Sequence, residues 1–333
     1  MNTMKNSKKA EKNTGVPDTD KFWLIIKKYF QRLEEWYNDS LFYHLIGFLI
    51  MTAENGENEL RVIISESDKH ETKYDFKFYL VERIKERYPS YKNIETLNYN
   101  DPDLKPTLLL FNILTIITSQ KQDMRFPFNS YKTQDFDVEH IYSQTDKIVK
   151  KGQESIKWAN AILEYFTGCE ELEQQQLYYN EVNSGNNPKN KDDFADLQIE
   201  KESLDYIFTE LFKISKDDKN SKIQDVFYRI QKIFKEDRPI GTHYISNLAL
   251  LDASTNRAYK NWIFPVKRSI ILKNEKSGQF IPLCTKNVFM KAYSKRFTEM
   301  MYWNPSDADA YFNAIKTTLL KLDTLIDDLE ENR

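Results

Sequence analysis

Residues 137–140, Asp-Val-Glu-His, place a histidine beside two carboxylates, and two asparagines that could complete a site, Asn247 and Asn256, lie more than a hundred residues downstream. Histidine is a general base suited to neutral pH. Carboxylate and amide oxygens are the hard donors that Mg²⁺ or Mn²⁺ prefers, and Mg²⁺ needs few protein ligands because it keeps several waters. A base and a divalent cation are what phosphodiester hydrolysis requires.

The sequence leaves alternatives open at this site. Strand alternation puts Asp137 and Glu139 on the same face, so it does not separate them as metal ligands; we favour Glu139 because it adjoins His140. His243 could replace His140 as the base, although a structural role is expected for it. Asn261 is either a neighbour of the metal site or a helix-surface or capping residue.

A basic stretch follows the second half of the site. Residues 257–296 contain ten Lys or Arg residues against one acid, Glu275, in a chain whose net charge is −3. This imbalance predicts a polarised basic face that holds a phosphate backbone without reading its sequence. The residues expected to contact phosphate are Arg257, Lys260, Lys267 and Arg268.

Two short strands are expected to position these groups. Apolar and polar residues alternate from Tyr131 to Tyr142, with Phe136 and Val138 on one face. Residues 244–251 form a short apolar run, and 252–256 read as a turn into the N-terminus of a helix. The intervening residues 145–240 are polar and suggest helices at 154–167, 196–214 and 222–235. They are expected to be an insertion that leaves and returns at nearby points.

The remaining patterns are helical. A helix starting near Asp20 carries an apolar face of Phe22, Ile26, Tyr29, Leu33 and Trp36. Asp39 and its neighbours are expected to cap a buried helix at 41–52, and 58–66 is either helix or strand. Further helices are expected at 75–87 and 106–119, and a C-terminal helix is expected to be capped by Ser306. His44 is interpreted as a packing residue and His70 as a solvated one.

These elements define a mainly α fold with a small β element. The expected domains are a disordered tail at 1–18, a helical domain at 19–124, a nuclease domain at 125–300 with the helical insertion at 145–240, and a C-terminal helix at 301–333. With only 8 Gly the chain has no Gly-rich phosphate loop. Two distant cysteines and the absence of a long apolar run favour a soluble cytoplasmic protein with no membrane association.

Three runs together resemble a known family. They are RFPFNSYKTQDFDVEHIYSQ, ISNLALLDASTNRAYKNWIFPVKR and FIPLCTKNVFMKAYS. Asp-x-Glu-His-Ile, then Asn-Leu-x-Leu-Leu and an Asn nine residues after the first, look like the HNH (His-Me finger) nuclease site. The residues of the three runs resemble in particular the HNH-bearing half of GmrSD-type modification-dependent restriction endonucleases. The resemblance covers roughly residues 20 to 325.

The resemblance implies a ββα-metal nuclease core and a role for each matching residue. His140 matches the general base, Glu139 the acidic metal ligand and Asn256 the second ligand, with Asp137 as a rival. Asn247 matches the asparagine that orients the segment carrying the histidine. The implied cofactor is Mg²⁺ or Mn²⁺, and the implied substrate is DNA, including modified phage DNA, in an antiviral restriction system.

One departure concerns the partner. Members of this group often carry a nucleotide-hydrolysing, modification-sensing half with an Asp-Gly-Gln-Gln-Arg motif, and this sequence contains no such motif. The chain therefore resembles the nuclease half alone. We expect it not to hydrolyse nucleotides and to depend on a separate sensing subunit or domain for control. Two alternatives remain: a non-catalytic DNA-binding or assembly subunit, and an RNA-directed HNH nuclease.

Overall fold

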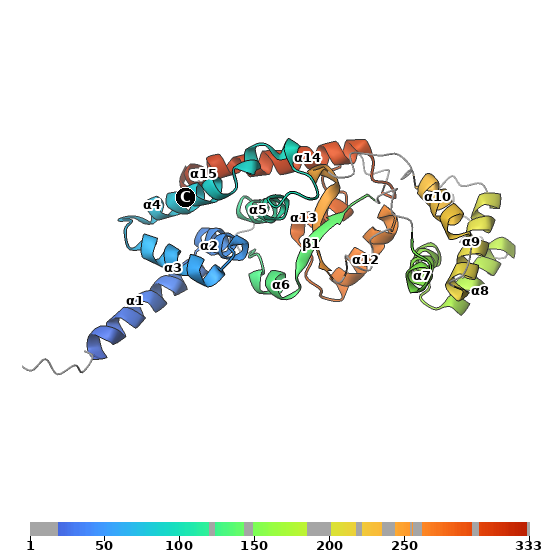
Figure 1. Ribbon diagram of the computed structural model, residues 1–333, viewed down its shortest axis with the longest axis horizontal. Coiled ribbons are helices and arrows are strands. Elements are labelled where there is room, and N and C mark those ends of the chain that lie inside the picture. The colour runs from blue at the N-terminus through green and yellow to red at the C-terminus, as the bar shows by residue number, and fades with distance from the viewer. Residues whose placement is uncertain are drawn as a thin grey trace, which may run out of the picture.

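The structure, a computed structural model, describes residues 19–119, 124–142, 149–184, 201–217, 222–234, 244–253, 255, 262–294 and 300–331. Within them the chain is mainly helical, with a small two-stranded antiparallel sheet. Both features were expected from the sequence. Figure 1 shows an elongated arrangement in which β1 lies between helices α2 to α5 on one side and helices α7 to α10 on the other.

The first part of the chain is a helical layer. Its elements are α1 (Thr19–Asn38), α2 (Ser40–Thr52), α3 (Gly56–Ser67), α4 (Lys73–Arg87), η1 (Pro89–Lys92), η2 (Ile94–Thr96) and α5 (Leu104–Ile117). Asp39 caps α2 as predicted, because its carboxylate accepts hydrogen bonds from the backbone N–H groups of Leu41 and Phe42. Helices α2 and α5 are apolar around most of their circumference and are buried accordingly.

The sheet and its neighbours follow. The elements are α6 (Phe128–Thr133), β1 (Phe136–His140), α7 (Gln153–Thr167), α8 (Leu172–Ser184), α9 (Lys201–Lys216), α10 (Ile223–Ile233), η4 (Ile245–Asn247), β2 (Leu248–Asp252), α12 (Phe264–Lys276), α13 (Leu283–Phe289), α14 (Pro305–Leu320), η5 (Lys321–Asp323) and α15 (Leu325–Glu331). The strand expected from Tyr131 is shorter than predicted. Residues 128–133 form a helix, and Asp135, at a φ of 50°, turns the chain into β1.

Strands β1 and β2 pair antiparallel although their sequences are far apart. Phe136 lies opposite Asp252 and His140 lies opposite Leu248. The chain segments before and after the predicted insertion therefore meet at one sheet, as the sequence interpretation required. Of the ten residues in the two strands, only Asp137 is exposed, and the others are buried.

Two hydrophobic clusters hold the described residues together. The first joins α2, α4 and α5 with β1, β2, α13 and α14, so the boundary expected at 124/125 falls inside one cluster. The second is built from α7, α9 and α10, which belong to the predicted insertion, together with Trp262, Ile263 and Val266 at the start of α12. The insertion thus has a core of its own that is anchored to α12.

Two details of the helix termini and faces differ from expectation. The C-terminal helix α14 is capped by Asn304 and not by Ser306, because Asn304 and Asp307 form a reciprocal capping box with Pro305 in the first turn. In α1 only Trp36 of the predicted apolar face is buried, whereas Phe22, Ile26 and Leu33 are exposed.

His44 is a packing residue, as predicted. Its ring is fully buried, with Nε2 3.0 Å from the backbone nitrogen of Phe126 and Nδ1 2.6 Å from the carbonyl oxygen of Ser40. The neutral ring satisfies both contacts when Nδ1 carries the proton, since Nδ1 then donates and Nε2 accepts. Burial lowers the pKa of His44 below its ordinary value of 6.5.

This depressed pKa predicts acid sensitivity. Below pH 6.5 the unfolded chain binds a proton at His44 that the folded chain resists, so stability falls as the pH falls through that value. We expect the melting temperature to drop between about pH 7.5 and about pH 5.5 by more in the wild type than in His44→Gln. Parallel melting curves for the two proteins across this range would contradict the assignment.

None of the helices in the described part of the chain combines the length and the apolar composition that crossing a bilayer requires.

Candidate functional site

The end of β1 and the start of β2 are joined through Asn247. The backbone N–H of Ile141 donates to the carbonyl of Asn247 at 2.8 Å, and the N–H of Tyr142 donates to its side-chain Oδ1 at 2.8 Å. The side-chain Nδ2 returns a longer bond of 3.4 Å to the carbonyl of Tyr142. Asn247 is completely buried. It therefore fixes the backbone immediately after His140.

Loss of this side chain predicts a local destabilisation. Asn247→Ala leaves the buried N–H of Tyr142 without its acceptor, which costs about 1–3 kcal/mol. The midpoint of urea-induced unfolding measures the loss. Asn129→Ala, at an exposed position in α6, is the matched control and is expected to change stability by less than about 0.5 kcal/mol. Equal midpoints for the two variants would contradict the role given to Asn247.

Glu139 is buried and ion-paired. The ammonium of Lys267, on α12, lies 2.6 Å from Oε1 of Glu139 and 2.6 Å from the carbonyl oxygen of His140. Lys267 itself is 1% exposed. The second carboxylate oxygen, Oε2, makes no hydrogen bond within the described part of the chain.

Lys267 is consequently placed differently from the sequence expectation. It was predicted to contact phosphate, but its charge is buried in the protein against Glu139. The local sequence could not reveal this, because its partner lies 128 residues earlier in the chain. Arg268 also makes an internal contact, since its Nε donates a hydrogen bond to the carbonyl of Phe289 at 2.9 Å.

Asp137 has a different environment from Glu139. It is exposed, and its Oδ1 accepts a hydrogen bond of 2.8 Å from the N–H of Val138. The alternation of β1 still places both carboxylates on one side. Burial and contact with Lys267 now distinguish them, which the sequence alone did not.

Tyr99 completes the surroundings of His140 and was not identified from the sequence. Its ring stacks on the imidazole with centroids 4.5 Å apart and an interplanar angle of 30°. Asn98 forms an isolated antiparallel bridge with Tyr244, and this bridge brings the loop after η2 beside the sheet. No pattern in residues 97–103 signals this contact, because it depends on how distant segments pair.

The pKa of the Tyr99 phenol is affected by burial and by the two acids. Burial raises its pKa above the ordinary value of 10.0, and the negative charges of Asp137 and Glu139 raise it further. His140 therefore lies against an aromatic ring that is itself within the electrostatic reach of both carboxylates.

The chain turns into a helix after β2. Oδ1 of the buried Asp252 accepts a hydrogen bond of 2.9 Å from the N–H of Thr255, the geometry of a helix N-cap. Residues 253 and 255 are helical. The predicted site residues Asn256, Arg257, Lys260 and Asn261 lie outside the described residues, as does the alternative base His243.

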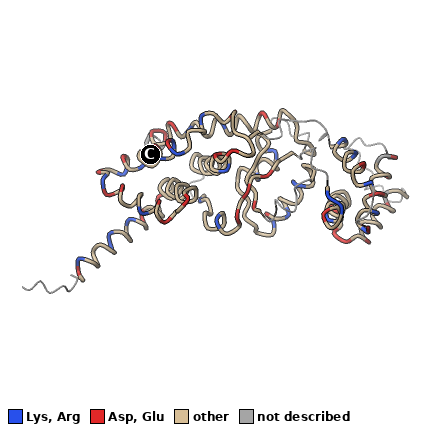
Figure 2. Tube along the Cα trace, in the orientation of Figure 1, with Lys and Arg blue, Asp and Glu red and all other residues tan. Residues whose placement is uncertain are grey.

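The predicted basic face is not found in the described part of the 257–296 stretch. Four of its cations are paired with acids from elsewhere in the chain or from the same stretch: Lys267 with Glu139, Lys273 with Glu164 and Glu170, Lys286 with Glu275, and Lys291 with Asp307. Figure 2 shows basic and acidic residues interspersed along the trace. The excess of cations in the stretch overestimates the charge left unpaired, because all of these acidic partners except Glu275 lie outside the stretch.

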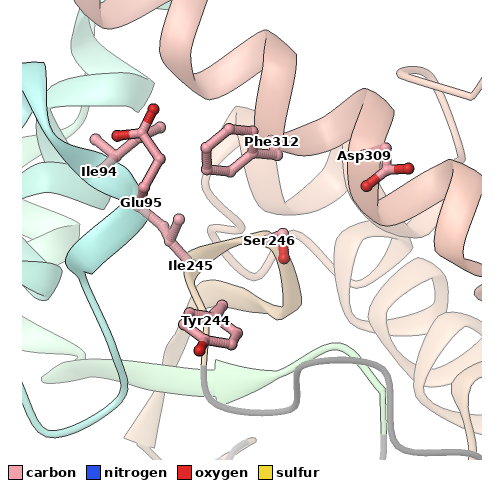
Figure 3. Close-up of a pocket in the computed structure, with 7 residues that line it drawn as sticks. All are labelled: Ile94, Glu95, Tyr244, Ile245, Ser246, Asp309 and Phe312. Atoms are coloured by element: carbon pink, nitrogen blue, oxygen red, sulfur yellow. The ribbon is translucent and has the colours of Figure 1, made fainter.

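A separate cavity lies beside the element that carries Asn247. It has a volume of about 290 Å³ and is formed by η2, η4 and α14 (Figure 3), with lining residues Ile94, Glu95, Tyr244, Ile245, Ser246, Asp309 and Phe312. None of the predicted site residues lines it. Its acidic side chains, one of which pairs with Lys316, do not favour a phosphate ligand.

Within the described residues, no three His, Cys, Asp or Glu side chains gather into a cluster that could hold a metal. The donors that the structure does bring together are the carboxylate of Glu139 and the imidazole of the adjacent His140. The helix start at Ala253 and Thr255 lies at the other end of β1, where the N–H of Ala253 donates to the carbonyl of Asp135 at 2.8 Å. A comparison with protein families, with curated proteins and with solved structures finds no match for this chain.

Proposed function

We propose that this chain is a divalent-metal-dependent HNH endonuclease that hydrolyses DNA phosphodiesters. The observation that carries the proposal is the antiparallel pairing of β1 with β2 across the insertion. It joins Asp-Val-Glu-His to the segment with Asn247, followed by the helix start capped by Asp252. This order of strand, strand and helix supports a ββα-metal core.

In this proposal His140 is the general base. Its imidazole takes the proton from the attacking water, a task for which histidine is suited at neutral pH. The ring of Tyr99 orients the imidazole, Lys267 binds the carbonyl of His140, and Asn247 holds the two residues that follow. A base positioned by neighbours at two points loses little freedom when it reacts.

In this proposal a divalent cation is bound beside His140. The free oxygen of Glu139 is a hard donor of the type that Mg²⁺ or Mn²⁺ takes, and Asn256, with Asp137 as a rival, would complete a sparse ligand set. When bound, the ion supplies positive charge at the phosphoryl and leaving oxygens. The hydrogen bond from Lys267 to Oε1 fixes the orientation of the Glu139 carboxylate, and Oε2 is the oxygen assigned to the cation.

Substitution of each carboxylate in turn tests which one binds the metal. We expect Glu139→Gln to raise the Mg²⁺ concentration for half-maximal nicking by about 10–100-fold, the loss typical of a weakened ligand shell. Asp137→Asn, which alters an exposed acid two residues away, is the matched control and should change it less. A larger effect of Asp137→Asn would transfer the ligand role to Asp137.

One observation favours a second candidate, a non-catalytic DNA-binding or assembly subunit. The ammonium of Lys267 already neutralises Glu139 at 2.6 Å, as a fixed cation would in a site that has lost its metal. Retention of labelled duplex DNA without cleavage, both alone and with a sensing subunit, would support this candidate.

The class of nucleic acid is tested by offering the purified chain a DNA duplex and an RNA duplex of the same sequence with Mg²⁺. The proposal predicts strand breaks in the DNA. Preferential cleavage of the RNA would favour an RNA-directed nuclease, and a duplex carrying modified bases tests whether modification is required. Control by nucleotides is expected to need a separate sensing subunit.

A further inference from the structure

One side of α1 exposes a continuous apolar stripe. Its large side chains are each between 42% and 65% exposed: Phe22, Trp23, Ile26, Phe30, Leu33 and Tyr37. At 100° per residue they fall within about one third of the helix circumference. Monomeric proteins rarely expose so large a contiguous apolar area without using it.

The contacts that attach α1 to the rest of the protein leave this stripe facing solvent. Trp36, on a different side of the helix, is buried and stacks on Phe76. Arg32 and Lys28 both bind Asp68 after α3, at 2.8 Å. Figure 1 shows that α1 extends away from the other helices and approaches them only at its C-terminal end. The stripe is therefore held accessible along its length.

The area suits association between two copies. Six such side chains, roughly half exposed and about 200 Å² each, present roughly 600–700 Å² of apolar surface. A stable interface buries about 800 Å² on each partner, part of which is polar rim. Residues 1–18, which directly precede α1, contain few large apolar side chains with which to cover it.

We propose that α1 pairs antiparallel with α1 of a second copy, about a twofold axis near Phe30. In this register Phe22 faces Tyr37 of the second copy and Ile26 faces Leu33, so the stripe is self-complementary. Each copy contributes the same surface, and because the helices are antiparallel the two bodies lie at opposite ends of the pair.

The charges beside the stripe match this arrangement. Lys27 and Glu34 are seven residues apart on the same flank, both exposed, and neither makes an ion pair in the described part of the chain. Antiparallel pairing brings Lys27 of each copy near Glu34 of the other. A lipid surface fits less well, because Glu34 borders the stripe and the charges of Lys28 and Arg32 are already paired with Asp68.

Sedimentation velocity of the full chain at micromolar concentration tests the pairing. The expected mass is twice 39.7 kDa for the wild type and 39.7 kDa for Leu33→Asp, with unchanged circular dichroism because Leu33 is exposed. A wild type of 39.7 kDa overturns the proposal, including the case in which it binds anionic vesicles through α1. A Leu33→Asp protein that remains dimeric also overturns it.

Charge reversal tests the antiparallel register. Lys27→Glu and Glu34→Lys should each weaken the dimer by about 10-fold or more, since two attractive pairs become repulsive. The double variant, and an equimolar mixture of the two single variants, should recover it. Lys157→Glu on α7 is the matched control and should leave the dimer intact. Failure of both recoveries overturns the proposed register.

Discussion

Replacement of His140 by alanine is expected to slow metal-dependent DNA nicking by about 10²–10⁴-fold, because a positioned general base contributes a factor of that size. The side chain is buried at the end of β1 and stacks on Tyr99. Its removal leaves Glu139 and Lys267 in place. We therefore expect the loss in the rate constant at saturating Mg²⁺ and not in the metal requirement.

The control for this prediction is a histidine outside the site. His70→Ala alters a half-buried residue in the turn before α4, where the ring packs on Phe76 and Tyr79. It should leave the nicking rate within a few-fold of the wild type. Melting curves on all three proteins establish that the rates refer to folded chains. Equal rates for wild type and His140→Ala would remove His140 from the chemistry.

Replacement of Lys267 by methionine is expected to destabilise the protein by about 3–5 kcal/mol, because it leaves Glu139 as a buried charge without its partner. It also removes the donor to the carbonyl of His140. The midpoint of urea-induced unfolding measures the change. Lys273→Met is the matched control on the same helix; its ammonium is exposed and its pairing should contribute less than about 1 kcal/mol.

A double-mutant cycle separates the ion pair from simple packing. Glu139→Gln alone leaves Lys267 buried opposite a neutral amide, and the double variant Glu139→Gln, Lys267→Met contains neither charge. If the pair is the cause, the double variant should be more stable than the sum of the single losses predicts. Additive losses would show that the two side chains act independently.

Local patterns were sufficient for much of the framework. Apolar runs with helical spacing predicted the buried helices α2 and α5, and Asp39 was recognisable as a cap. The two strands were found because their apolar runs are short and flanked by turn residues. Their shared sheet followed from the requirement that residues of one site must meet, since nothing in either strand alone specifies its partner.

Other features depend on contacts that no local pattern records. Glu139 and Lys267 meet across 128 positions, and Tyr99 reaches His140 from a loop in the N-terminal helical layer. The periodicity of α1 reveals an apolar face but not whether other elements cover it. Most of that face is exposed, and only Trp36 is buried. At α14 the capping residue lies before Pro305, because proline is tolerated in the first turn and Asn304 can reach the N–H of Asp307.

The proposed dimer has a consequence for cleavage that rests on the nuclease assignment. One HNH site cuts one strand in each event, so two copies would supply the two sites that a double-strand break needs. Leu33→Asp should then retain nicking of supercoiled plasmid while forming less linear product. Linear product in undiminished proportion would separate dimerisation from cleavage.

The most direct measurement is the conversion of supercoiled plasmid to open circles by the wild-type chain in Mg²⁺, in excess EDTA, and after Mg²⁺ is restored. The proposed site predicts nicking in Mg²⁺, none in EDTA and recovery when the metal returns. Nicking that persists undiminished in EDTA, or its absence in Mg²⁺ and Mn²⁺ with and without a sensing subunit, would contradict a metal-dependent nuclease at Glu139 and His140.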